Sequence, residues 1–165
     1  ERGFGNGMLL PAGPLREPLR RLDRVDALVV NGAVLFPHAT LPHEAPVFEM
    51  NLGGRTFYDL LNPRRQTGPE HFARQHAHAV AAIGNPQRFF NHLRELGISF
   101  VAHPFPDHHA FEAADFAFDD YGTVIMTEKD AVKCESFGNE NFWVLRVDAD
   151  IDPELGELIL RKIGK

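Results

Sequence analysis

The spacing of hydrophobic residues along the second half of the chain predicts short buried strands that alternate with helices. Short apolar runs ended by glycine or polar residues are typical of buried strands, and they lie at 78–83, 98–102, 123–127 and 142–147. Between these runs, apolar side chains recur at the spacing of one face of a helix. That spacing predicts helices over 86–96, 111–118, 128–134 and 153–163.

This order of elements predicts the fold class. Strands that alternate with helices over short connections form βαβ units, whose right-handed crossovers give a parallel sheet covered on both faces. We therefore expect an α/β fold with a mostly parallel sheet flanked by helices, a Rossmann-like α/β/α sandwich.

The first part of the chain is less regular. Residues 1–25 are rich in Gly and Pro at their start and are expected to form a linker, with 26–165 as one α/β domain. The apolar run 27–31 predicts a buried strand. The alternation over 47–52, a Gly-Gly turn and a second run at 57–61 predict a possible β-hairpin.

Composition limits the kinds of partner that the chain is expected to bind and the cellular compartments in which it is expected to function. The formal net charge of −6 disfavours nucleic acid as a partner. The single cysteine, Cys134, cannot form an intramolecular disulfide and favours a reducing compartment. No apolar run reaches transmembrane length. A chain that opens at Glu1 in a Gly-rich turn is expected to be a piece of a longer protein.

The densest group of candidate site residues follows the run 98–102, where a fold of this class keeps its ligand. Asp107 and His108 could orient one another, because a carboxylate fixes the tautomer and pKa of an imidazole, and so contact a phosphate, a Mg²⁺-bound water or a base. Alternatively, Asp107 only caps a helix. A zinc site of His103, His108 and Asp107 is a third interpretation, although the spacing matches no zinc signature.

A second candidate group begins the helix at 128–134. Lys129 could meet a phosphate, and Thr127 could bond a nucleotide, because backbone N–H groups at a helix start favour anions. The alternative is a plain N-cap by Thr127 with Asp130 in the first turn. The turn at 84–88 could approach a ligand closely because Gly84 has no side chain, but as a plain strand-to-helix turn it needs no ligand.

Other features of the sequence argue against a phosphate loop and a catalytic cysteine within this chain. No Walker A string, G-x-x-x-x-G-K-[ST], occurs in the chain. Cys134 is not expected to be a catalytic thiol. A basic cluster could attract an anionic lipid surface but is more simply a solvated helix face; it comprises Arg16, Arg20, Arg21 and Arg24.

Five segments, taken in order, resemble one family closely. They are RGFGNG at 2–7, LLPAGPLREP at 9–18, AIGNPQRFF at 82–90, FPDHHAF at 105–111 and MTEKDAVKC at 126–134. These segments resemble the tetraacyldisaccharide 4'-kinases of Gram-negative bacteria, and the resemblance runs nearly end to end, weakening over 33–70 and the C-terminal tail.

The resemblance implies an ATP- and Mg²⁺-dependent kinase that phosphorylates the 4'-hydroxyl of tetraacyldisaccharide 1-phosphate to give lipid IVA in lipid A biosynthesis. It implies two α/β/α lobes at the cytoplasmic face of the inner membrane, with peripheral membrane contact. The phosphate-loop lobe, which would hold most of the ATP and Mg²⁺, would lie upstream of Glu1. Residues 1–25 would then be the interlobe join and 26–165 the C-terminal lobe, soluble by itself and inactive alone.

The resemblance also assigns residues. The Asp-His of the family's D-H-H motif faces the nucleotide, which carries over to Asp107 and His108 as catalytic residues, with His108 also contacting the nucleotide. Lys129 and Thr127 carry over more weakly as nucleotide contacts, and no metal ligand is assigned. Two alternative functions to the kinase remain: a non-catalytic nucleotide or sugar-phosphate binding module, and a small metal-dependent enzyme using the His-rich loop.

Overall fold

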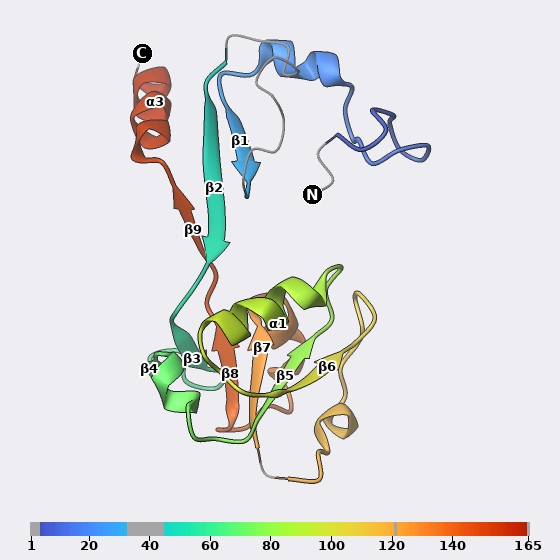
Figure 1. Cartoon of the computed structure of the whole chain (residues 1–165), viewed down its shortest axis with the longest axis vertical. Helices are drawn as coiled ribbons and strands as arrows, with labels where there is room; N and C mark the ends of the chain where they lie inside the picture. The colour runs from blue at the N-terminus through green and yellow to red at the C-terminus, as the bar shows by residue number, and fades with distance from the viewer. Residues whose placement is uncertain (1–3, 33–44, 121, 165) are drawn as a thin grey trace. The chain divides into compact units, whose positions relative to one another are not determined.

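The computed structural model describes residues 4–32, 45–120 and 122–164 (Figure 1). By its internal contacts the chain divides into two compact units. One comprises Glu1–Leu52 with Ala149–Lys165, and the other is Gly53–Asp148. The assignment of 1–25 as a join and 26–165 as a lobe stays a prediction.

The second unit is built on a mixed sheet with strand order β4-β3-β8-β7-β5-β6. β5, β6, β7 and β8 are parallel to one another, whereas β3 runs antiparallel to both β4 and β8. The bounds of the strands are β3 (Phe57–Asp59), β4 (Gln66–Thr67), β5 (Ala77–Ala81), β6 (Val101–Pro104), β7 (Thr123–Thr127) and β8 (Phe142–Leu145). The predicted α/β class, with parallel strands flanked by helices, is confirmed.

The two helices of this unit cover opposite faces of the sheet. α1 (Pro86–Glu95) buries Leu93 in one hydrophobic cluster with Ala79 of β5, and Figure 1 shows it crossing in front of the strands. α2 (Glu128–Cys134) buries Ala131 in a second cluster with Val80 of the same strand. Because successive strand residues point to opposite faces, the α/β/α layering follows from these contacts.

Short 3-10 helices within the described ranges join these elements or precede them: η1 (Leu19–Arg24), η3 (Pro69–Phe72) and η4 (Ala113–Phe116). The helix predicted over 111–118 is wrong in type and length. Glu112 and Asp115 cap η4 reciprocally. On either side of η4, Phe111 belongs to the second cluster and Phe118 packs against it. Both side chains therefore reach this cluster without a regular helix over 111–118.

The first unit contains a small sheet of order β1-β2-β9 and helix α3 (Pro153–Ile163). β1 (Leu28–Asn31) pairs in parallel with β2 (Val47–Gly53), and β9 (Asp148–Ile151) lies on the other side of β2. The ammonium group of Lys162 in α3 pairs with the carboxylate of Asp26 at 2.5 Å. Among the described residues, no helix is both long enough and apolar enough to cross a membrane.

Two predictions for this region need correction. The strand predicted over 27–31 is present as β1, but it is not buried: its residues are half-buried and exposed in alternation, because it lies in the small sheet. The hairpin predicted between 47–52 and 57–61 does not form, because β2 pairs with β1 and β3 pairs with β4 and β8. Short alternating runs show which segments are strands but not which strand each one joins.

Candidate functional site

The candidate site lies at the carboxyl ends of β5, β6 and β7. β5 stands between the other two, so the chain passes to β6 on one side and returns to β7 on the other. α1 and α2 therefore leave on opposite faces, which opens the position where ligands bind in sheets of this kind. The three segments predicted to meet here do so: the loop after β5 at Gly84, the loop after β6 at Asp107, and the junction at Thr127 where β7 passes directly into α2.

Backbone hydrogen bonds hold the loop after β6 against the end of β5. The Phe105 N–H donates to the carbonyl of Ala81 at 2.9 Å, and the His108 N–H donates to the carbonyl of Ala82 at 3.3 Å. His108 has φ of 64°, in the left-handed region that side-chain-bearing residues seldom adopt. A non-glycine residue in this conformation is often found where function fixes the backbone.

Asp107 is the centre of a charged group at this edge. Its carboxylate accepts a hydrogen bond from the Lys129 ammonium at 3.1 Å, and the Nε2 atom of His108 lies 3.7 Å away. The Lys129 hydrogen bond, helped by the charge of His108, lowers the pKa of Asp107. Asp107 is therefore ionised at neutral pH.

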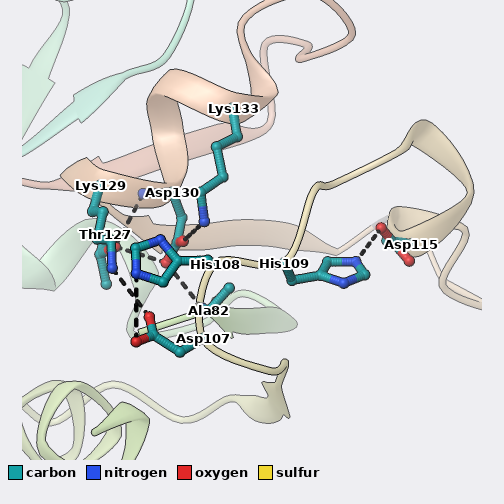
Figure 2. A network of polar contacts seen from close by, with 9 residues as sticks. All are labelled: Ala82, Asp107, His108, His109, Asp115, Thr127, Lys129, Asp130 and Lys133. Atoms are coloured by element: carbon teal, nitrogen blue, oxygen red, sulfur yellow. Dashed lines mark hydrogen bonds and ion pairs between the residues drawn. The ribbon is translucent and has the colours of Figure 1, made fainter. Parts of the chain in front are cut away.

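The side chains of this group are open to solvent and so to a ligand. The exposed fractions are 76% for His108, 46% for Lys129 and 44% for Asp107. A Cβ atom on Gly84 would stand 3.5 Å from the Asp107 carboxylate, so the loop after β5 passes close beside it. An ionised carboxylate, an imidazole and an ammonium group thus gather on one accessible surface (Figure 2).

The start of α2 behaves as a helix cap. The Thr127 hydroxyl accepts a hydrogen bond from the Asp130 N–H at 3.2 Å and donates one to the Asp130 carboxylate at 2.7 Å. Both groups are buried. The N-cap interpretation of Thr127 and Asp130 is confirmed, and a contact between Thr127 and a nucleotide stays a prediction.

Cys134, the last residue of α2, is a free and buried cysteine. Burial, and then the charge of Asp130, raise the pKa of the Cys134 thiol to about 12. Because the thiolate is the nucleophile, a thiol with so high a pKa is unreactive at neutral pH.

The three histidines of the His-rich loop have different partners. His109 donates from Nε2 to the carboxylate of Asp115 at 2.9 Å, while His103 is hydrogen bonded to His78 at 2.9 Å. Only His108 lies beside Asp107. In the part of the chain that the structure describes, no group of three or more His, Cys, Asp or Glu is arranged to hold a metal ion.

A second polar group, which the sequence did not suggest, joins His103, His78 and Asp120. His78 bonds His103 through Nδ1 and Asp120 through Nε2, at 2.9 and 2.6 Å, and Phe118 stacks on both rings. Burial, together with the charge of His78, lowers the pKa of His103. The bond from His78 lowers the pKa of Asp120. His78 and Asp120 are 42 positions apart in sequence, so no local pattern connects them.

Because of the group His78, His103 and Asp120, we expect the free energy of unfolding to fall in acid. Because His103 has a lower pKa in the folded state, the unfolded chain binds more protons just below the ordinary histidine pKa of about 6.5, and the free energy of unfolding falls as pH falls through that range. The lowered pKa of Asp120 makes a further loss begin only near its ordinary value, about 3.8. Denaturant unfolding between about pH 5 and about pH 8 should show this slope. His103→Phe should flatten the slope, whereas the exposed His108→Ala should not; an unchanged slope in His103→Phe would refute the assignment.

The fold and the site together define an α/β lobe that presents charged side chains at the carboxyl edge of its parallel strands. The chain belongs to the family described as Tetraacyldisaccharide-1-P 4'-kinase, LpxK, whose model matches residues 1–164.

Curated relatives and a solved structure are similar to the chain. It is 48% identical over 165 residues to a tetraacyldisaccharide 4'-kinase of Methylobacillus flagellatus, covering 100% of this chain and 47% of that protein. It is 46% identical to one of Dechloromonas aromatica, covering 98% and 48%. A crystal structure of LpxK from Aquifex aeolicus in complex with ATP aligns with a TM-score of 0.68 and 27% identity, covering 94% of this chain and 48% of that one. The chain thus spans about half the length of these relatives.

Proposed function

We propose that this chain forms part of an ATP-dependent kinase that phosphorylates the 4'-hydroxyl of tetraacyldisaccharide 1-phosphate, giving lipid IVA for lipid A biosynthesis. The observation that carries the proposal is the family match over residues 1–164. The position of Asp107 and His108 supports it, since both lie on the accessible carboxyl edge of the sheet. The remainder of the protein, about half of each relative's length, would supply the missing Walker A string.

The site of this chain fits one side of a nucleotide. His108 and Lys129 offer exposed nitrogen donors of the kind that phosphate oxygens accept. Mg·ATP, held mainly by the rest of the protein, supplies the phosphoryl group. Phosphoryl transfer depends chiefly on positioning and on electrostatic stabilisation, so a second lobe contributes by placing a few charged groups well.

Each residue of the site has a distinct part in this proposal. The exposed His108 imidazole would act as the catalytic acid or base, a role that histidine fills most often. The ionised Asp107 carboxylate, 3.7 Å from the imidazole Nε2, would orient the ring. Lys129, bonded to Asp107 at 3.1 Å, keeps that carboxylate charged and in place.

The acceptor lipid would bring the protein to the cytoplasmic face of the inner membrane as a peripheral protein. Exposed apolar side chains near the start of the chain, Met8 and Leu10, are followed by the arginines of η1. Apolar and basic groups together favour an anionic lipid surface. In the same proposal, residues 1–25 join the lobes and 26–165 belong to the C-terminal lobe.

The test is transfer of labelled phosphate from Mg·ATP to tetraacyldisaccharide 1-phosphate. The complete protein should transfer phosphate, and the 165-residue chain alone should not exceed a no-protein control, because its sequence has no Walker A string. Turnover by the chain alone would refute the division of labour. A complete protein that folds and transfers nothing would refute the kinase proposal and favour a nucleotide or sugar-phosphate binding module.

A further inference from the structure

The carboxylate of Asp130 is completely buried, with an exposed fraction of 0%. It accepts three hydrogen bonds: from the Ala82 N–H at 3.0 Å, from the Thr127 hydroxyl at 2.7 Å and from the Lys133 ammonium at 3.0 Å. A buried charge is costly unless it is paired and hydrogen bonded. A helix cap alone would not need a carboxylate enclosed in this way.

The bond to Ala82 connects Asp130 to the candidate catalytic loop. Ala82 directly follows β5 and is itself buried, and its N–H is bound by Asp130. The carbonyl of the same residue accepts the hydrogen bond from the His108 N–H at 3.3 Å. One residue therefore stands between the buried carboxylate and the backbone of His108, which is in the left-handed conformation.

A second connection runs from the adjacent residue of α2. Lys129 donates to the side chain of Asp107, so the first turn of α2 is bonded directly to the loop after β6 and is connected to the next residue, His108, only through Ala82 (Figure 2). Lys129 acts on the Asp107 carboxylate from the solvent side. Asp130 acts on the His108 backbone from the interior, through Ala82.

We propose that Asp130 is a positioning residue for phosphoryl transfer, holding His108 in place through the backbone of Ala82. This inference rests on the proposed kinase function. Asp130 does not meet the reacting atoms, since it is enclosed by the protein. Its effect on rate therefore arises from where it places the backbone of His108, and a small displacement of a catalytic group can cost about a hundredfold.

The Lys133 ammonium provides a way to separate positioning from stability. It binds the Oδ1 atom of Asp130, whereas Ala82 and Thr127 bind Oδ2. Lys133→Met therefore leaves the Ala82 bond in place while removing a partner of the buried charge. Asp130→Ala combined with Lys133→Met removes both charges, so that neither is left unpaired in the interior, and also removes the acceptor for the Ala82 N–H.

The experiment compares these two variants in the complete kinase. Lys133→Met should lower stability and keep kcat within about threefold of the parent. Adding Asp130→Ala should lower kcat by a further tenfold to a hundredfold, roughly, in protein shown to be folded. In a His108→Ala background the same addition should change kcat by less than about threefold, because residues that act as a unit are not additive.

The proposal would be overturned if the double variant had the same kcat as Lys133→Met. It would also be overturned if adding Asp130→Ala lowered kcat as much in the His108→Ala background as in the parent. Amide hydrogen exchange separates this failure from a failure of the proposed function. The Ala82 and His108 amides should exchange faster in the double variant than in Lys133→Met, whether or not the parent is active. Unchanged exchange in the double variant would show that Asp130 does not hold His108. Faster exchange in the double variant, together with a parent that is inactive, would support the connection between Asp130 and His108 and refute the kinase role.

Discussion

Replacing His108 by alanine in the complete protein is expected to lower kcat for lipid phosphorylation about a hundredfold or more, the usual cost of removing a positioned catalytic acid or base. The side chain is 76% exposed and lies 3.7 Å from the Asp107 carboxylate. Because most of this side chain is exposed, its loss should affect chemistry much more than stability. The measurement is labelled-phosphate transfer at saturating Mg·ATP and lipid.

His109→Ala is the matched control, because His109 is the next residue of the same loop. Its imidazole is bonded to Asp115 and stacks on Phe105, away from Asp107. We expect its kcat to stay within about threefold of the parent. Equal losses in the two variants would point to a general disturbance of the loop. Parent-like activity in His108→Ala would refute the site assignment while leaving the family membership intact.

Replacing Leu93 by alanine is expected to lower the free energy of unfolding by about 2–5 kcal/mol, the usual range for a fully buried leucine. Leu93 lies on α1 with an exposed fraction of 0%, in the cluster that joins this helix to β5 and β7. Truncation leaves a cavity in a close-packed interior, which adds to the lost transfer free energy. Denaturant titration followed by tryptophan fluorescence measures the change.

The fluorescence probe and the control both lie in the same unit as Leu93. Trp143 is the only tryptophan of the chain and is buried in the same cluster. Leu61→Ala removes the same atoms from a side chain that is 55% exposed, and should change the free energy of unfolding by no more than about 0.5 kcal/mol. Similar changes in the two variants would mean that α1 does not cover the sheet as described.

Local sequence patterns were sufficient for the elements nearest to the site. The strand predicted at 123–127 and the helix predicted at 128–134 have the bounds of β7 and α2. An uninterrupted apolar run ends there at Thr127, whose hydroxyl caps the helix. Both signals depend only on neighbouring residues, so the sequence carries them in full.

The convergence of Asp107 and Lys129 could also be predicted, although they are 22 positions apart. Each follows a strand, and the carboxyl ends of parallel strands meet at one edge of a sheet. The prediction needed the parallel order of the strands and nothing about side-chain packing. The backbone conformation of His108 could not be predicted from the strand order, because a positive φ at a non-glycine residue is set by the hydrogen bonds around it.

The sequence by itself determined the α/β class, the family, the loop that carries Asp107 and His108, and the helix start that carries Lys129. Only the tertiary structure decided the strand partners of β1, β2 and β3, the His78–His103–Asp120 group and the burial of Asp130. The bonds of the last two, His78 to Asp120 and Asp130 to Ala82, join residues 42 and 48 positions apart. Periodicity and capping are local properties of a chain, whereas such contacts depend on how distant segments pack together, which no local pattern records.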